Sequence, residues 1–274
     1  MKVVLLTSDY YISANIAVRE FLRSQNLERN DIEIAAIVSA SNFDMSKRLL
    51  KRSWKFLHQS GFKFFAYNVL LNIWKTLKIR FGKWFVKDSK REYFSIGEMA
   101  KVYKIPFLHV SDINSKESEA FIKKFKPDFL ASCLLLQIAK KNILDLPSRC
   151  AINFHPALTQ KHRGAFGAFW ALLKNWKHSG ATVHFMTEDL DSGKVILQRR
   201  FFIHPSDTLY SLNEKSARLG GRLLAMALVK LKRNINVGYF LNNLGNKFTM
   251  PTEKEVKHFF MKKKFIKIRD FFKV

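Results

Sequence analysis

Apolar and polar positions along the first 40 residues follow two different periods. Short apolar runs at residues 2–6 and 32–40, each bounded by polar residues, are typical of buried strands. Between these runs, residues 14–25 (ANIAVREFLRSQ) carry apolar side chains at helical intervals, as in a helix that buries one face. Strand, helix and strand in this order predict the beginning of a parallel α/β sheet.

The same pattern returns near residue 95 and continues to about residue 232. It predicts helices over 95–105, 115–125, 168–176 and 208–232, and strands over 106–111, 126–136, 150–155, 180–188 and 194–203. Short apolar runs that alternate with helices need crossover connections, so we expect an α/β fold with a mostly parallel sheet flanked by helices. Sites in such sheets lie at the carboxyl ends of the strands, which directs attention to the end of the run at 150–155.

Residues 45–91 interrupt this pattern with a basic and aromatic segment. They contain 13 Lys and Arg residues, a single acid (Asp88) and ten interleaved aromatic residues. Apolar positions recur there at intervals of three, four and seven, which predicts an amphipathic helical insertion. Three interpretations stay open: a helical pair with solvated lysines, a surface for an anionic membrane, or a surface for nucleic acid. Residues 253–274 form a second basic amphipathic segment with the same possible partners.

Charge and cysteine content narrow the class of protein further. The 274 residues include 48 Lys and Arg against 22 Asp and Glu, a net charge of +26 that favours an anionic partner such as tRNA, anionic lipid or a phosphorylated substrate, without choosing among them. The two cysteines, Cys133 and Cys150, lie in apolar runs without metal-type spacing, as expected in a reducing compartment. No apolar stretch approaches the ~20 residues of a membrane span. We therefore expect a cytoplasmic protein, with a peripheral position at the inner membrane face as the alternative.

Polar residues that could take part in catalysis lie within the run at 150–155 and after it. Asn153 and His155 are two positions apart, so on a strand their side chains share one face. Downstream, the stretch GATVHFMTEDLDSGKVI contains Asp191 in an Asp-Ser-Gly turn. An Asn amide donates hydrogen bonds, a His titrates near neutrality and an Asp orients a His. Because no Ser or Cys stands in a nucleophile motif, we expect the substrate's own nucleophile to attack an acyl group directly.

The order and spacing of these motifs resemble the formyltransferase catalytic domain. The series is N-x-H, Arg-Gly eight residues after His155, G-x-T-x-H, and D-x-G with Asp191 thirty-six residues after His155. The resemblance covers about residues 1–44 and 95–205, with a looser similarity over 239–256. It implies a Rossmann-like sheet without dinucleotide, a catalytic domain over 1–205 that carries the insertion, and a C-terminal helix and basic tail over 206–274. About 70 residues after 205 are too few for the complete substrate domain of methionyl-tRNA formyltransferases, so we expect a short form.

The resemblance also implies roles for particular residues. Asn153 would bind the formyl oxygen, His155 would stabilise the charged intermediate and move a proton, and Asp191 would hold His155 and a relaying water. The implied formyl donor is 10-formyltetrahydrofolate, contacted near Leu136, Gln137, Ile138, Thr187 and Asp189. Arg163 and Gly164 would lie near the acceptor entrance. We expect His184 to be mainly structural, and we expect no metal because no further Cys or acid is spaced as a ligand.

One stretch departs from the family pattern. Residues 157–160 read Ala-Leu-Thr-Gln where many members have Ser-Leu-Leu-Pro, and Gly167 stands where a proline is usual. We therefore expect a looser loop between the strand and the following helix.

The predicted function is formyl transfer to a primary amine, as in methionyl-tRNA formyltransferases. Three alternatives remain: an amino-sugar N-formyltransferase acting on a nucleotide- or lipid-linked sugar, a formyltetrahydrofolate hydrolase, and a non-catalytic family member that binds RNA or membrane. The sequence leaves the amine acceptor, the oligomeric state and the role of residues 45–91 undecided.

Overall fold

The computed structural model describes residues 1–9, 12–24, 29–40, 95–187 and 189–262, together with 54, 57–71, 73, 74 and 77. Residues 57–71 are helical, as predicted for this part of the insertion, with a left-handed backbone at Gly61 (φ 76°). The parts of the two basic segments outside the ranges just given, and the helical predictions that fall on them, lie outside the described residues.

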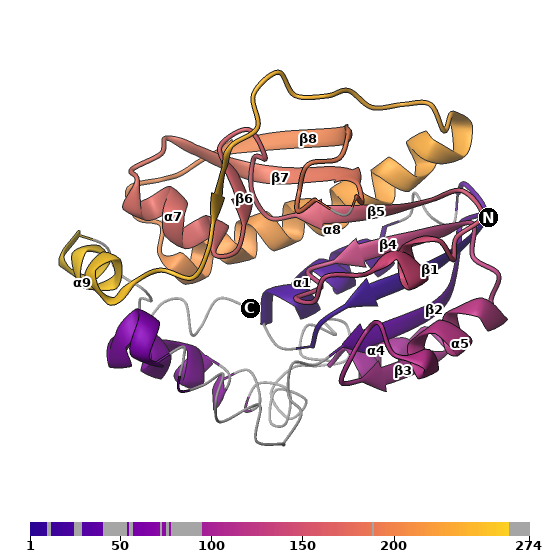
Figure 1. Ribbon diagram of the computed structural model, residues 1–274, viewed down its shortest axis with the longest axis horizontal. Helices are drawn as coiled ribbons and strands as arrows, with labels where there is room; N and C mark the ends of the chain where they lie inside the picture. Colours follow the sequence, from indigo (N-terminus) through magenta and orange to yellow (C-terminus); the bar gives the residue numbers. More distant parts are fainter. Residues whose placement is uncertain are drawn as a thin grey trace.

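A seven-stranded sheet forms the centre of the molecule, in the order β3-β2-β1-β4-β5-β7-β8 (Figure 1). Its strands are β1 (Lys2–Thr7), β2 (Glu33–Ala40), β3 (Phe107–Val110), β4 (Phe129–Cys133), β5 (Cys150–His155), β7 (His178–Phe185) and β8 (Val195–Phe202). The pairs among β1 to β5 are parallel, whereas β7 and β8 join antiparallel. The predicted α/β fold with a mostly parallel sheet is confirmed.

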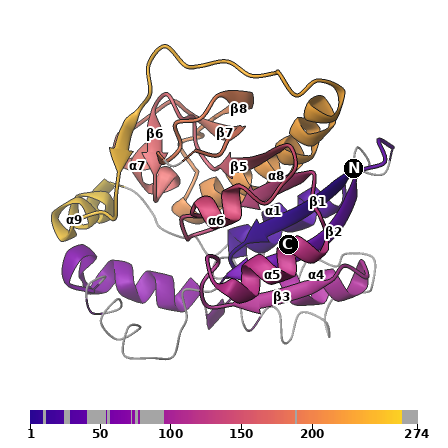
Figure 2. The same ribbon diagram turned by 45° about the vertical axis from the view of Figure 1, so that its right-hand side comes forward.

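Helices cover both faces of this sheet (Figures 1 and 2). One face packs against α1 (Ile12–Leu22), α4 (Ile96–Val102) and α8 (Leu209–Arg233), and the other against α5 (Lys116–Lys124) and α6 (Lys141–Leu144). The longest of them, α8, contributes a row of buried leucines and alanines to the first core. The expected domain boundary at residue 205 stays a prediction, but α8, which follows it, packs directly on α1 and β7.

Side-chain caps fix where several helices begin. Ser95 accepts a hydrogen bond from the backbone N–H of Glu98, whose carboxylate accepts one from the N–H of Ser95. Thr208 caps the first turn of α8 in the same reciprocal way with Ser211. Such caps satisfy backbone N–H groups that have no partner within the helix. They explain why the predicted and observed helix starts agree closely.

Strand order reverses beside β1, which has β2 on one side and β4 on the other. The carboxyl ends of β1 and β4 are held together there, because the Thr7 hydroxyl donates to the carbonyl of Cys133 at 2.8 Å. The N–H of Leu136 donates to the Ser8 hydroxyl at 3.0 Å. Ligands of open α/β sheets bind outside such a switch point. The end of β5, next to β4, lies at the same edge of the sheet.

Two short strands were not predicted. β6 (His162–Gly164) and β9 (Asn246–Phe248) pair in parallel as a separate two-stranded sheet. Three residues are too few to show an alternating pattern, so periodicity gives no signal for them. Together they bring the segment after α8 back onto the loop that follows β5.

A third core lies beside the main sheet and joins four segments. Helix 57–71 packs with α7 (Gly167–Leu173), α9 (Glu253–Lys262) and the start of α8. The ring of Phe169 lies 5.5 Å from that of Phe64 and 4.7 Å from that of Phe259, measured between centroids. The main-chain carbonyls of Met250 and Pro251 accept hydrogen bonds from Gln59 and Ser60. The described parts of the two basic segments are therefore neighbours in space (Figure 2).

Replacing Gly220 with alanine should destabilise the protein, although alanine is the better helix former. The added methyl carbon would lie 1.9 Å from the Phe154 ring, which packs on α8 from β5. Overpacking of this kind costs about 1–3 kcal/mol, more than the ~1 kcal/mol that alanine gains over glycine in a helix. Urea unfolding should show a lower midpoint for Gly220→Ala. Met226→Ala at an exposed position of α8 is the control, expected within about 0.5 kcal/mol of the parent. A Gly220→Ala protein as stable as this control would contradict the packing.

Candidate active site

The end of β5 presents two polar side chains on one face. Phe154 points into the core beneath α8, while its neighbours Asn153 and His155 both reach Asp191 on the opposite side. This is the alternation expected of a strand. The strand ends at His155 because Pro156 has no N–H to continue the ladder. The predicted common face of Asn153 and His155 is present in the structure.

The turn after β7 carries Asp191 back to this face. Asp191 adopts a left-handed backbone conformation with φ of 52°. Two residues later, a methyl group on Gly193 would lie 2.0 Å from the carbonyl oxygen of Phe185. Only glycine permits this close approach, so Gly193 folds the turn tightly onto β7. The D-x-G spacing in the sequence therefore has a direct structural cause.

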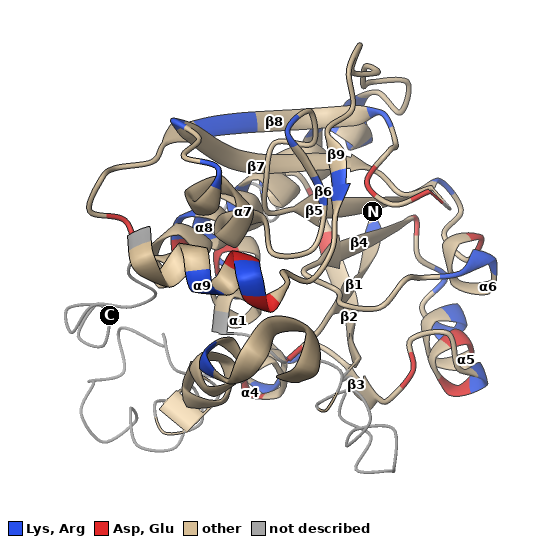
Figure 3. Ribbon diagram, turned by 60° about the vertical axis from the view of Figure 1, so that its left-hand side comes forward, with Lys and Arg blue, Asp and Glu red and all other residues tan. Residues whose placement is uncertain are grey.

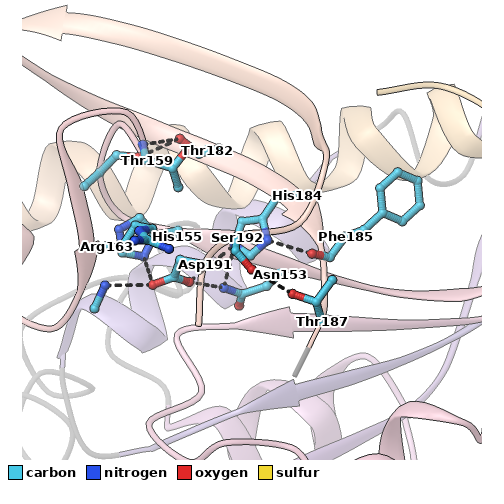
Figure 4. A network of polar contacts seen from close by, with 12 residues as sticks. Asn153, His155, Thr159, Arg163, Thr182, His184, Phe185, Thr187, Asp191 and Ser192 are labelled. Carbon is cyan, nitrogen blue, oxygen red and sulfur yellow. Dashed lines mark hydrogen bonds and ion pairs between the residues drawn. The ribbon is translucent and has the colours of Figure 1, made fainter. Parts of the chain in front are cut away.

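Asp191 is the centre of a polar network (Figure 4). Its Oδ2 lies 3.3 Å from Nδ1 of His155 and accepts a hydrogen bond of 2.8 Å from the N–H of Gly164. Its Oδ1 accepts from Nδ2 of Asn153 at 3.4 Å. Gly164 has φ of 92°, and a side chain there would collide with the carbonyl of Phe248 in β9. The Arg-Gly motif thus supplies a backbone donor that a larger residue could not place.

His184 also joins this network. On β7 it pairs in register with Asn153, and its Nε2 lies 3.3 Å from Asn153 Nδ2 and 3.4 Å from Asp191 Oδ1. Its other nitrogen, Nδ1, faces the carbonyl of Phe185 at 2.8 Å, which assigns a proton to Nδ1. The residue is buried and fully hydrogen-bonded. Sequence reasoning expected a structural histidine beside the site, and the structure places it in contact with two of the predicted site residues.

His162 belongs to the site and was missed from the sequence. Its ring stacks on His155, with centroids 5.6 Å apart, and on Phe248 at 5.0 Å. Nδ1 of His162 lies 3.4 Å from Nε2 of His155, while Nε2 of His162 faces the carbonyl of Ala165 at 3.0 Å. The sequence feature that could have identified His162 as a site residue is its position directly before the Arg-Gly motif. A histidine seven residues from another does not reveal stacking, because the intervening loop decides the distance.

Burial and neighbouring groups set the charges in this network. Burial lowers the pKa of His155, and His184 adds to the effect, against the opposing influence of Asp191. Burial also lowers the pKa of His162, to about 4. Burial disfavours ionisation of Asp191, but His155, His184 and the Gly164 N–H outweigh it and hold the pKa of that carboxyl well below its usual range. Near neutral pH, His155 and His162 are therefore neutral beside an ionised Asp191.

The surroundings of His155 prepare it to receive a proton. In its neutral form the proton belongs on Nδ1, which faces the Asp191 carboxylate. Nε2 is then a free base that faces two acceptors, the carbonyl of His162 at 3.1 Å and the His162 ring nitrogen. If Nε2 gains a proton, the new N–H can donate a hydrogen bond to the carbonyl of His162. The geometry therefore stabilises the charged form of His155, while burial stabilises the neutral form.

The loop after β5 is buried and held in place. Thr182 donates to the carbonyl of Ala157 at 2.7 Å and accepts from the N–H of Thr159 and from Gln198. Ala157, Leu158 and Thr159 are almost inaccessible to solvent. The expectation of a looser loop was wrong, because the threonine of the G-x-T-x-H motif anchors the loop from the neighbouring strand.

The residues predicted to contact a donor lie in two places. Leu136 and Ile138 are exposed beyond the end of β4, while the Gln137 side chain is hydrogen-bonded to the backbone of Ser111 and Ile113. In the loop after β7, the Thr187 hydroxyl donates to the carbonyl of Asp189. These positions stay predictions.

Asp189 instead contacts Arg163, one of the two residues predicted for the acceptor. Its carboxylate accepts from Arg163 at 3.4 Å and from Lys247 at 2.5 Å. These pairs hold the pKa of Asp189 below its usual range, with the hydrogen bond from Lys247 as the main cause. The structure therefore connects Arg163 to the turn that carries Asp191.

A cavity of about 330 Å³ opens next to the loop that follows β7. It lies where the start of β5 meets the end of β7 and α6, and is lined by Lys141, Leu144, Asp145, Cys150, Ala151, Phe185, Met186 and Thr187. A mixture of apolar walls and a few polar groups is typical of small-molecule pockets. Within the described parts of the chain, no group of three or more His, Cys, Asp or Glu side chains is arranged to hold a metal ion.

The fold and the network define an α/β protein with a histidine and a carboxylate at the carboxyl end of its sheet. The family described as formyl transferase matches residues 89–228, just over half of the chain. The chain belongs to this family, which confirms the resemblance seen in the sequence.

Several relatives share its sequence over part of their length. The chain is 37 % identical over 115 residues to a methionyl-tRNA formyltransferase of Clostridium tetani, covering 42 % of this chain and 37 % of that protein. It is 31 % identical over 146 residues to one of a Thermotoga species, covering 53 % and 47 %. The matched segments thus span less than half of these relatives.

Solved structures share the fold over most of the chain. A glycinamide ribonucleotide transformylase of Symbiobacterium toebii superposes with a TM-score of 0.58 at 16 % identity, covering 90 % of this chain and 94 % of that one. A formyltetrahydrofolate deformylase of Pseudomonas syringae gives a TM-score of 0.59 at 18 % identity, covering 89 % and 66 %. An N-formyltransferase of Helicobacter canadensis, solved with folinic acid and dTDP-3-aminofucose, gives 0.54 at 17 %, covering 90 % and 70 %. At these identities the likeness establishes the Rossmann-like formyltransferase fold.

The buried neutral state of His162 should make stability depend on pH. Its pKa falls to about 4 in the folded protein, whereas an unfolded histidine titrates near 6.5. Between about pH 6.5 and 4 the unfolded chain binds the proton more readily, so the free energy of unfolding should fall as pH falls through this window. His162→Gln should reduce the slope by up to one proton, or about 1.4 kcal/mol per pH unit, in urea unfolding.

The control for this experiment is His204→Gln, which removes a histidine from the surface. Equal slopes for His162→Gln and the parent protein would show that His162 is not held neutral. A change of the same size in the control would point instead to a general effect of removing one histidine.

Proposed function

We propose that this protein transfers a formyl group from 10-formyltetrahydrofolate to a primary amine. The observation that carries the proposal is the network of Asn153, His155 and Asp191 at the carboxyl end of β5, in a chain of the formyl transferase family. An amide donor, a neutral imidazole and a carboxylate are the groups that direct attack on a carbonyl needs. The reaction exchanges one C–N bond for another, so no nucleophile of the protein is required.

The donor, when bound, supplies a formyl group attached to nitrogen. Of Asn153, His155 and Asp191, only Asn153 is half-buried. Its amide is therefore the donor that a formyl oxygen would meet, with one Nδ2 hydrogen leaving its long contact with His184 or Asp191. We assign the ring system of the donor to the cavity beside Thr187, which is lined by Leu144, Phe185 and Met186 among others. Two structures with the same fold were solved with folate compounds, folinic acid in one and 5-N-formyltetrahydrofolate in the other.

His155 takes the proton that the attacking amine must lose and returns a proton to the donor nitrogen as the bond between that nitrogen and the formyl carbon breaks. Nε2 is the free base in the neutral ring, and the carbonyl of His162 lies 3.1 Å away to accept the new N–H. Asp191, already ionised, balances the positive charge that forms on the ring. The carbonyl and the ring of His162 are then the acceptors for the new N–H, so the charged imidazole is hydrogen-bonded on both nitrogens. His184 holds Asn153 and Asp191 in register from the next strand.

The acceptor we favour is methionyl-tRNA. Relatives that are 30 to 37 % identical over part of their length are methionyl-tRNA formyltransferases. The net charge of +26 suits a polyanion, since contacts between basic residues and phosphates dominate affinity for nucleic acids. Arg163, held by the carbonyl of Gly245 and by Asp189, lies on β6 directly before the Gly164 N–H that binds Asp191. A basic group fixed beside the network is suited to orient an anionic acceptor.

Amino sugars are the second candidate acceptor, carried by nucleotides or by lipids. Sugar N-formyltransferases share the fold, and the same network would serve any primary amine. The third candidate is hydrolysis, in which water replaces the amine and formate is released. A family member that binds RNA or membrane without catalysis is the fourth. Catalysis in the cytoplasm is common to the first three.

Incubation with donor labelled in the formyl group separates these functions. We expect label in methionyl-tRNA; label in an amino-sugar nucleotide or in formate would identify the other two reactions. His155→Asn and Asp191→Asn should lower turnover by about 10²–10⁴-fold, because each removes part of the proton-transfer pair. Asn153→Ala should lower it by about 10²–10³-fold through the loss of an oxyanion donor.

His204→Gln, on the surface away from the network, should keep the parent turnover. Thermal unfolding of each variant separates lost chemistry from lost folding. Full activity of a folded His155→Asn, Asp191→Asn double variant would overturn the proposal, and so would silence of the parent protein with every acceptor and with water.

A further inference from the structure

Helix 57–71 and its continuation at residues 73, 74 and 77 are apolar on both sides. One side faces the protein: Ser60, Phe64, Tyr67 and Asn68 are buried, and Phe64 packs on Phe166 and Phe169. The opposite side carries large apolar residues that are exposed: Phe62 (72 %), Val69 (39 %), Leu70 (64 %), Ile73 (50 %) and Leu77 (41 %). A helix that is apolar all round needs a second apolar environment.

The exposed residues form one stripe rather than a scatter. Counted from Phe62 they occur at intervals of seven, eight, eleven and fifteen, and these intervals return to the same side of an α-helix. Between them in sequence lie the residues that face the third core. We call this stripe the outer face. Single exposed apolar residues are common on proteins, but a contiguous row of five marks an interaction surface.

The neighbouring helix α9 extends the outer face. Its Phe260 and Met261 are exposed at 36 % and 77 %, and Nζ of Lys63 lies 5.5 Å from the centroid of the Phe260 ring. The two helices are fixed to each other by the hydrogen bonds of Gln59 and Ser60 and by the packing of Phe64, Val256 and Phe259 in the third core. The outer face is therefore formed by two helices that are held in a fixed relative position.

Charge identifies the kind of partner. Helix 57–71 contains a single charged residue, Lys63, and Figure 3 shows it as an almost uncharged ribbon beneath α9. The other twelve Lys and Arg residues of 45–91 flank the helix in sequence, with one acid, and residues 253–274 add eight basic residues against three acids. An apolar stripe within a cationic sequence matches the composition of interfacial helices on anionic lipid.

Two other partners fit less well. A second copy of this chain would bring a net charge of +26 against another +26 around the contact. RNA is held by cationic groups on phosphates and by aromatic rings that stack on bases. The centre of the outer face offers Val69, Leu70, Ile73 and Leu77, which do neither. Acyl chains are the partner that these aliphatic side chains suit.

We propose that the outer face, defined by Phe62, Val69, Leu70, Ile73 and Leu77 and extended by Phe260 and Met261 of α9, docks on an anionic phospholipid bilayer. Docking is peripheral: the apolar side chains enter the headgroup boundary while the flanking lysines and arginines bind the lipid phosphates. None of the helices in the described part of the chain is long and apolar enough to cross a membrane. The proposal is independent of the proposed formyl transfer, because it uses none of the residues of the polar network.

Co-sedimentation of the full chain with vesicles tests this docking. We expect binding to vesicles of equal parts phosphatidylcholine and phosphatidylglycerol, and much less to vesicles of phosphatidylcholine alone. Phe62→Ser and Leu70→Ser should each weaken binding to the anionic vesicles about tenfold, since each removes an inserted apolar side chain. Phe240→Ser is the matched control, because Phe240 is as exposed (68 %) but lies in the loop after α8.

Hydrogen exchange on the parent protein gives a readout that needs no variant. Backbone amides of 57–71 should exchange more slowly when anionic vesicles are added, while those of the exposed strand β8 should not change. Vesicle binding that is equal in Phe62→Ser, Leu70→Ser and the control would overturn the proposal, since charge alone would then explain it. If Phe62→Ser or Leu70→Ser abolished a dimer in sedimentation velocity, or abolished tRNA binding without weakening vesicle binding, the outer face would belong to another partner. Either result would also overturn the proposal.

Discussion

A buried carboxylate holds the candidate site together. Asp191 contacts the ends of β5, β7 and β6 through His155, His184 and Gly164, respectively. An ionised carboxylate away from water is unfavourable unless hydrogen-bond donors surround it. Asp191 meets this requirement with the amide of Asn153, the imidazole of His155 and the backbone N–H of Gly164. These donors come from β5 and β6, and His184 contacts the carboxylate from β7, so Asp191 fixes the relation between segments that are distant in sequence.

The same requirement explains the glycines around the site. Gly193 lets the turn approach β7, and Gly164 lets its N–H reach Asp191 while β9 passes against it. Both positions exclude a side chain because backbone atoms of another segment occupy the space. His162 follows from this arrangement, since the backbone of β6 that presents Gly164 also stacks the His162 ring on His155. The proton chemistry of His155 therefore depends on the segment after α8, which supplies β9 and Phe248.

Helix 57–71 packs on residues next to β6 and so connects the outer face to the small sheet beside the polar network. Its inner side contacts Phe166 and Phe169, and Phe166 is two residues from Gly164. α9, which follows β9, packs on the other side of Phe169. The two basic segments are thus built onto the small sheet that borders the polar network, while their outer face points away from it. A surface that binds a membrane would hold the network at a fixed orientation to that membrane.

The sequence determined the α/β class and nearly all strands of the main sheet and the helices that cover it, because these depend on periodicity and on local caps such as Ser95. The alternation of side chains along a strand likewise determined the common face of Asn153 and His155. It also determined Asp191 as a site candidate, since the glycine two residues later demands a tight turn. Only the tertiary structure decided that His162 stacks on His155 and that His184 contacts Asn153 and Asp191. It also decided that Thr182 anchors the loop at 157–159 and that the described parts of the two basic segments lie side by side. These contacts join residues whose separation along the chain carries no period, and only the packing of the elements around the sheet brings them within bonding distance.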